Sequence, residues 1–189
     1  MKMKRILLML FGMLMSWNAS ALDVAGVHLY DTMQVGDASL QLNGAGLRTK
    51  FFFKIYVGAL YLPEKQASAE AIIADTSAYR VVMYIKHSLS SRQLSNSVLE
   101  ALEDNQTPAE MSAMSPQLEQ LKAIFAAVGE VNPNDVVSLD YLPASGTHIL
   151  VNGKERGVIA GADFSRALLR IWLGKHPVQE DLKKGMLGG

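Results

Sequence analysis

Two side chains in one apolar segment have the chemistry to bind an anion. Arg48 begins the run "RTKFFFKIYVGALYL", residues 48–62, and Tyr56 lies in the middle of it. A guanidinium keeps its charge, and its planar fork of N–H donors matches a carboxylate or a phosphate. A phenol adds one O–H donor. Arg48 is therefore either a surface charge in a salt bridge or the group that meets a negatively charged ligand, and Tyr56 either lines the same pocket or packs within the sheet.

Other common kinds of site have little support in the sequence. The chain has no cysteine, which excludes disulfides, thiolate nucleophiles and cysteine-based metal sites. Gly44 and Gly46 precede a predicted strand instead of a helix, which argues against a nucleotide-binding loop. The sequence also lacks a Gly-x-Ser-x-Gly motif, so serine hydrolysis has no local support. We expect no cofactor and no metal, because no two of the four histidines are three or four residues apart. These are His28, His87, His148 and His176.

The first 21 residues have the pattern of a secretory signal peptide. A basic start, "MKMKR", precedes the apolar run "ILLMLFGMLMSW", and Ala19-Ser20-Ala21 is a small-residue cleavage site. The apolar run is too short for a transmembrane span. We expect cleavage after Ala21, which leaves residues 22–189 as one mature domain. The leader is typical of bacterial export, so we expect a periplasmic location.

Charge excludes one class of partner. The whole chain has 18 basic and 18 acidic residues, and removal of the leader takes away Lys2, Lys4 and Arg5. The mature chain then carries a net negative charge and has no global attraction for nucleic acid or for anionic lipid. No second apolar stretch is long enough to be a stable membrane anchor, and the sequence does not identify a protein partner.

Hydrophobic patterning predicts strands on both sides of Arg48. Residues 25–42 form short strands with a turn at Gly36-Asp37, and Asn43-Gly44 marks a second turn. Residues 47–61 then read as one long strand that ends at Pro63. The alternation places Phe51 and Phe53 on the core face and Arg48, Lys50, Phe52, Lys54 and Tyr56 on the other face. In a straight strand Arg48 and Tyr56 would be about 26 Å apart, so both contact one small ligand only if the strand bends.

The later segments complete an α+β architecture. We expect a short helix at residues 68–75, a buried strand at 79–87, and a helix that begins at Ser90 with Gln93 in a capping box. Ser115-Pro116 begins the next helix. Residues 135–160 contain three strands with a tight turn at Asn152-Gly153, and a last helix follows, capped by Asp163 and ended by Gly174. Hairpins dominate, so the sheet should be mostly antiparallel, with helices on one face.

Three segments in this order resemble the chalcone isomerase family. They are "GAGLRTKFFFKIYVGALYLPEK", "YRVVMYIKHSLSSRQLSNSVLEAL" and "ILVNGKERGVIAGADFSRALLRIWLGKHP". The first is similar to the family's Gly-x-Gly-x-Arg turn and following strand, and the last to its closing hairpin and helix. The resemblance spans about residues 24–177 and is greatest to the bacterial exported branch of chalcone isomerase-like proteins. It implies an open-faced β-sandwich, a large, mostly antiparallel sheet with a layer of helices on one face.

The resemblance also implies roles for individual positions. In the plant enzymes an arginine orients the substrate and stabilises negative charge, and that position is Arg48 here. A threonine and a tyrosine that support the enolate fall at Tyr56 and Leu94, and an asparagine falls at Ala101. Leu94 and Ala101 cannot donate a hydrogen bond, and the loss of one such donor can cost about 2.7–4 kcal/mol of transition-state stabilisation. The family also contains non-catalytic members that bind fatty acids through the arginine.

Three functions follow from these observations. The first is a binding protein for a small amphiphilic acid, either a fatty acid or a phenolic compound, with Arg48 paired to the anion and Tyr56 and Leu94 lining the pocket. The second is an intramolecular lyase that cyclises a chalcone-like enone, with Arg48 and Tyr56 as catalytic residues. The third is a protein-interaction module without a small ligand, which would use the open face of the sheet.

Overall fold

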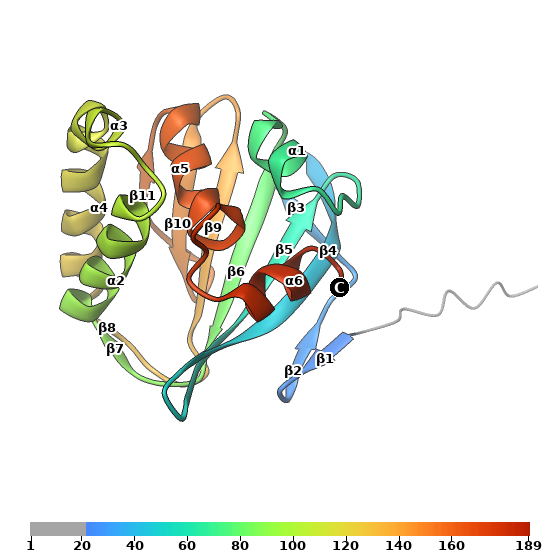
Figure 1. Cartoon of the computed structure of the whole chain (residues 1–189). Coiled ribbons are helices and arrows are strands. Elements are labelled where there is room, and N and C mark those ends of the chain that lie inside the picture. Colours follow the sequence, from blue (N-terminus) through green and yellow to red (C-terminus); the bar gives the residue numbers. More distant parts are fainter. Residues whose placement is uncertain (1–21) are drawn as a thin grey trace, which may run out of the picture.

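Residues 22–189 are described here by a computed structural model, and the predicted leader lies outside the described residues. The main sheet has seven strands in the order β11-β10-β9-β6-β5-β4-β3 (Figure 1). Every neighbouring pair in it is antiparallel. The strands are β3 (Thr32–Val35), β4 (Ala38–Lys50), β5 (Phe53–Leu62), β6 (Tyr79–Ile85), β9 (Val136–Leu142), β10 (Gly146–Val151) and β11 (Lys154–Ile159).

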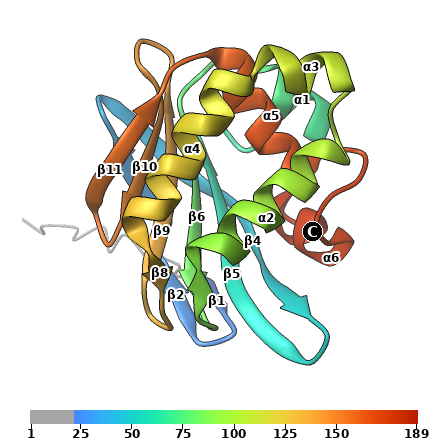
Figure 2. The same cartoon turned by 90° about the vertical axis from the view of Figure 1, so that its left-hand side faces the viewer.

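Two small two-stranded sheets and six helices complete the described part of the chain. The small sheets pair β1 (Leu22–Val24) with β2 (Val27–Leu29), and β7 (Leu89–Ser90) with β8 (Glu130–Val131). The helices are α1 (Ala69–Ala74), α2 (Ser91–Glu103), α3 (Pro108–Ala113), α4 (Ser115–Val128), α5 (Ala162–Leu173) and α6 (Glu180–Met186). Helices α2, α4 and α5 cover the same face of the main sheet (Figures 1 and 2). The predicted α+β open-faced sandwich is therefore confirmed.

Alternation along the strands divides the core into two layers. On the helix side, Leu60 and Val81 pack with the apolar faces of α4 and α5. On the opposite side, Val57 and Ala59 pack with Val27 and the rest of the β1–β2 hairpin. The open face of the sheet is therefore partly covered by the chain's own N-terminal hairpin.

The prediction of one long strand over residues 47–61 is wrong. The chain reverses at Phe51 and Phe52, so β4 and β5 form a hairpin in which Arg48 pairs directly with Tyr56. Phe51 takes a positive φ of 55°, a conformation that bulky residues rarely adopt. The three phenylalanines of the turn are therefore not core residues: Phe51 is 87%, Phe52 100% and Phe53 57% exposed. Apolar residue types concealed the turn, because its sequence contains none of the usual turn formers.

The turn predicted at Asn43-Gly44 is also absent, because both residues lie inside β4. Asn43 and Gly44 instead contact helix α6, which was not predicted from the sequence. A Cβ atom on Gly44 would lie 2.2 Å from the carbonyl oxygen of Gly185, so only glycine permits α6 to pack this closely. Asn43 is buried and donates its side-chain amide to the Met186 carbonyl at 2.8 Å. These residues serve a helix–strand contact instead of a turn.

The helix boundaries were predicted with mixed success. Ser90 and Gln93 form the expected capping box of α2, and Gly174 ends α5 as expected. Asp163 does not cap α5, because the N-cap is Gly161 and Asp163 lies in the first turn, paired with Arg166. Helix α3 was missed, although Thr107 and Glu110 form a second capping box. No helix among residues 22–189 has the length and apolarity needed to cross a bilayer.

Candidate functional site

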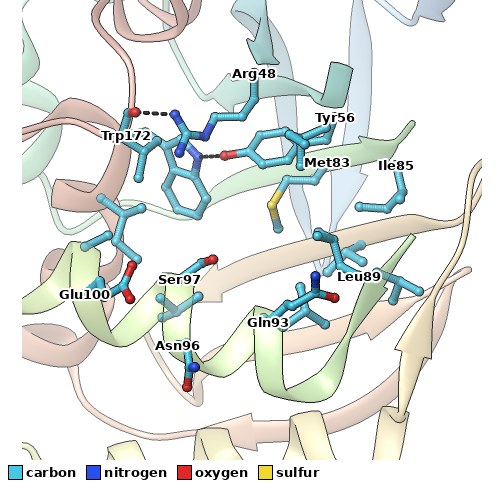
Figure 3. Close-up of a pocket in the computed structure, with 18 of the residues that line it drawn as sticks. Arg48, Tyr56, Met83, Ile85, Leu89, Gln93, Asn96, Ser97, Glu100 and Trp172 are labelled. Atoms are coloured by element: carbon cyan, nitrogen blue, oxygen red, sulfur yellow. Dashed lines mark hydrogen bonds between the residues drawn. The ribbon is translucent and has the colours of Figure 1, made fainter. Parts of the chain in front are cut away.

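A cavity of about 650 Å³ lies between the main sheet and the helix layer (Figure 3). Its volume falls in the range of about 300–1,000 Å³ that is common for small-molecule sites. Most of its wall is apolar, with side chains from five strands of the main sheet, from the β7–β8 pair and from helices α2, α4 and α5. Typical wall residues are Ile85, Leu139, Ile149, Leu121, Phe125 and Leu168. Such a cavity favours a ligand with a substantial apolar part.

Arg48 lies at one end of this cavity. Its side chain is half-buried, and its Nη1 donates a hydrogen bond to the backbone carbonyl of Val178 (Figure 3). That carbonyl is itself fixed, because the Val178 amide donates to the Ile171 carbonyl at 2.9 Å. None of the ion pairs within residues 22–189 includes Arg48. The guanidinium charge is therefore held in place by a neutral group and is not balanced by a carboxylate.

Gln179 holds the backbone on both sides of Arg48. Its side-chain oxygen accepts from the Thr49 amide at 2.8 Å, and its side-chain nitrogen donates to the Leu47 carbonyl at 3.1 Å. One amide side chain thus completes the hydrogen bonding of β4 at the strand edge. Because side chain and backbone are both tied to the segment after α5, Arg48 needs little ordering on binding.

Tyr56 extends into the cavity beside Arg48. It is buried on β5, and its hydroxyl accepts a hydrogen bond of 2.9 Å from Nε1 of Trp172 (Figure 3). Burial raises the pKa of Tyr56, and the bond from Trp172 and the charge of Arg48 lower it by less. The phenol is therefore neutral near pH 7 and keeps its proton. Among the described residues the Tyr56 hydroxyl donates no hydrogen bond, which leaves the O–H available to a ligand.

Arg48 and Tyr56 place two hydrogen-bond donors next to each other in the cavity wall. They are cross-strand partners in the β4–β5 hairpin, so their side chains leave neighbouring positions on adjacent strands. The separation expected from a straight strand does not apply, because the hairpin brings the two residues together. A charged fork and a neutral O–H at one end of an apolar cavity can bind a carboxylate or a phenolate while the rest of the ligand occupies the apolar part.

Leu94 and Ala101 line the cavity from helix α2. Leu94 is half-buried and Ala101 is buried, and both add only apolar wall. The positions where the family resemblance places a tyrosine and an asparagine therefore offer no donor here. All three predicted ligand-binding residues, Arg48, Tyr56 and Leu94, line one cavity, and their role in binding stays a prediction.

Exposed residues from several segments line the rim of the cavity. On one side are Lys50, Phe51 and Phe53 of the β4–β5 turn, together with His87, whose ring lies 5.0 Å from that of Phe53. On the other side is the outer part of α2. Its exposed lining residues are Gln93, Asn96, Ser97, Glu100 and Asp104.

Sequence reasoning missed the residues that position the donors. Trp172 is 116 residues from Tyr56, and Val178 is 130 residues from Arg48. In the sequence, the spacing of Trp172 indicates only a place on the apolar face of the last helix. No spacing rule links such distant positions. The one local indication was the indole N–H of Trp172, because a buried indole N–H needs a hydrogen-bond acceptor.

A separate polar cluster lies on the β10 side of the sheet. The hydroxyl of Ser145 is 2.6 Å from Nε2 of His148, and Nδ1 of His148 is 2.6 Å from the Glu155 carboxylate. This order of contacts is that of a serine–histidine–acid triad. None of the three lines the cavity, and the Glu155 side chain is 53% exposed. We interpret the cluster as a tie between β10, β11 and the turn before β10.

The fold and the cavity define the class of the protein, an open-faced sandwich with a cavity between sheet and helices. A profile of the chalcone isomerase-like family matches residues 21–188. The chain therefore belongs to the chalcone isomerase-like family. A search of curated proteins by sequence found no match. Among solved structures, the fold is similar to a crystal structure of an Arabidopsis thaliana fatty-acid binding protein, with a TM-score of 0.67 and 16% identity over 89% of this chain and 96% of that chain.

The Tyr56–Trp172 bond should be measurable as stability. Substitution Tyr56→Phe keeps the ring but leaves the buried Trp172 N–H without its acceptor, so we expect the free energy of unfolding to fall by about 1–2 kcal/mol. Urea denaturation measures this difference. Tyr141→Phe is the matched control, because Tyr141 is also a buried strand residue and no hydrogen bond of its hydroxyl is found in the described structure. Equal losses in the two variants would contradict the assignment.

Proposed function

We propose that this protein binds a small amphiphilic acid, with its anionic group on Arg48 and Tyr56 and its apolar part in the cavity. The observation that carries the proposal is an arginine without a carboxylate partner, fixed beside a neutral phenol at one end of an apolar cavity. The Arabidopsis protein with the similar structure is a fatty-acid binding protein, which supports the same class of ligand.

The cavity's shape favours a ligand with one polar end. The charged donor is at the end next to Val178, and the wall further in is formed by residues without ionisable groups, such as Leu139, Ile149 and Phe125. An acid with two separated charges would have to bury one of them without a partner, which costs several kcal/mol. A fatty acid or a phenolic compound with a single acidic group matches both the charged end and the apolar end of the cavity.

Loss of the guanidinium should weaken acid binding selectively. Charge-assisted hydrogen bonds contribute about 1.5–3 kcal/mol, so we expect Arg48→Ala to reduce the affinity for palmitic or lauric acid about 10- to 100-fold. Isothermal titration calorimetry of the purified protein measures the dissociation constants. The corresponding fatty alcohol should bind wild type and Arg48→Ala with similar affinity, because it has no charge to lose.

Lys54→Ala is the control for that experiment. Lys54 lies on the same hairpin and is exposed, but it does not line the cavity. Its removal should leave the affinity for the acid unchanged in solution. If Arg48→Ala binds fatty acids as tightly as wild type, the proposed role of Arg48 is wrong.

A second candidate function is intramolecular lyase activity on a chalcone-like enone. The observation that favours it is the pairing of Arg48 with Tyr56, which supplies two donors near one point of the cavity. Leu94 and Ala101 supply none, so any rate enhancement should be far below that of an enzyme with a complete donor set. The decisive measurement is the cyclisation rate of a hydroxychalcone, followed by absorbance with wild type and with Arg48→Ala. A rate equal to the spontaneous one in both samples removes this candidate.

We further infer that the protein belongs to the exported bacterial branch of the family and acts in the periplasm. The signal-like pattern of residues 1–21 supports this, with its basic start, apolar run and Ala19-Ser20-Ala21. Expression of the full chain in a Gram-negative host should yield a periplasmic product that begins at Leu22, as intact mass spectrometry measures. A cytoplasmic product with an uncleaved N-terminus would contradict the inference.

A further inference from the structure

The turn of the β4–β5 hairpin has a surface that folding alone does not explain. The hairpin tip, which we define as residues 50–54, consists of Lys50, three phenylalanines and Lys54. Phe51 and Phe52 are 87% and 100% exposed, and Phe53 is 57% exposed. Figure 2 shows that the hairpin projects past the end of helix α2. Three adjacent aromatic rings in water are unfavourable and mark a surface that meets an apolar partner.

The charged side chains of the β4–β5 hairpin all have one sign. The hairpin, residues 38–62, contains Arg48, Lys50 and Lys54 and no aspartate or glutamate. Lys86 lies next to it, since its amide donates to the Ile55 carbonyl at 2.8 Å. The chain as a whole has no excess of positive charge. The local excess is therefore a property of the hairpin.

The acidic groups of the rim lie further from the tip. Gln93 is next to Leu89, whereas Glu100 lies toward the other end of α2 (Figure 3). Leu89 follows His87 by two residues, and the His87 ring lies 5.0 Å from that of Phe53 in the tip. Glu100 and Asp104 follow Gln93 by about two to three helical turns. Their charge therefore does not cancel that of Lys50 and Lys54 at the tip.

Exposed phenylalanines between lysines match the boundary of an anionic bilayer. Aromatic rings enter the zone between headgroups and acyl chains, and each lysine near such a surface adds about a fivefold gain in binding. A protein partner would have to supply an acidic apolar groove, whereas a membrane offers both properties everywhere. Phe51 and Phe53 also line the cavity, and Arg48 is only two residues before Lys50, about 7 Å along the strand.

We propose that the hairpin tip docks reversibly on an anionic phospholipid bilayer and places the cavity rim against it, so that the acid passes between membrane and cavity without crossing water. The docking itself rests on the exposed tip, and the transfer role rests on the proposed function. Amphiphilic acids partition into bilayers, so the source of the ligand and the surface that the tip recognises are the same. Three rings and two lysines give a weak, reversible contact and not a permanent anchor.

A fluorescent label on the tip tests docking directly. Because the chain has no cysteine, Phe52→Cys gives a single site for an environment-sensitive fluorophore, and Ala67→Cys gives an exposed control site beyond the far end of β5. Both proteins are made from the full chain and share one N-terminus, so any effect of that segment is common to both. With phosphatidylcholine vesicles that contain phosphatidylglycerol, we expect a blue shift and quenching by brominated lipids at position 52 only. No shift at position 52, or equal shifts at both sites, would overturn the docking proposal.

An unlabelled variant tests the transfer role. Phe52→Ser combined with Lys54→Glu changes two exposed residues that do not line the cavity, so acid binding in solution should stay as in wild type. We expect its affinity for the anionic vesicles to fall about tenfold or more, and fatty-acid transfer from these vesicles to slow by a similar factor. Unchanged transfer would overturn the role of the tip.

The two proposals fail in different ways. If wild type binds no fatty acid in solution but the label at position 52 enters the bilayer, the proposed function fails and docking stands. If wild type binds fatty acid and the emission of the label at position 52 stays that of a label in water, docking fails and the proposed function stands. Vesicles without phosphatidylglycerol separate the charge contribution, because docking on them should be at least fivefold weaker.

Discussion

The pairing of Arg48 with Tyr56 across the β4–β5 hairpin is the constraint on which the rest of the site depends. Cross-strand neighbours place their side chains close together without any help from a loop, so the two donors share one location by the geometry of the ladder. Each donor is then fixed from the helix layer, Arg48 by the Val178 carbonyl and Tyr56 by the Trp172 indole. Helix α5 and the segment after it thus determine where the charge lies.

The C-terminal part of the fold is specialised for contact with β4. Gly44 permits the backbone of α6 to approach the strand, and Gln179 bonds the strand on both sides of Arg48. Asn43 adds a buried bond to the end of α6. Asn43 and Gly44, which were predicted to form a turn, therefore form a seam between strand β4 and helix α6. The seam lies on the helix side of the sheet, where Leu182 and Met186 join the core, and it occupies the part of β4 that precedes Arg48.

The fold class could be predicted because it follows from local patterns. The turn at Asn152-Gly153 and the capping box of Ser90 were read correctly, since each depends on a few adjacent residues. The β4–β5 turn could not be predicted, because alternating apolar residues usually indicate a strand and Phe51 accepts a strained φ. The same error hid the site, since a straight strand separates Arg48 from Tyr56. The contacts of Trp172 and Val178 could not be predicted for a different reason, because only the folded chain brings these residues near β4 and β5.

The wide separation along the chain between donors and their supports has a kinetic consequence. Contacts that join residues 116 and 130 positions apart close large loops, and such contacts form late and slowly. Because the chain is synthesised from its N-terminus, residues 38–62 of the β4–β5 hairpin are present well before residues 172–179. The aromatic turn is therefore formed while the cavity still lacks the wall that α5 supplies, so for that interval the nascent protein exposes the apolar lining of the cavity in addition to the three phenylalanines.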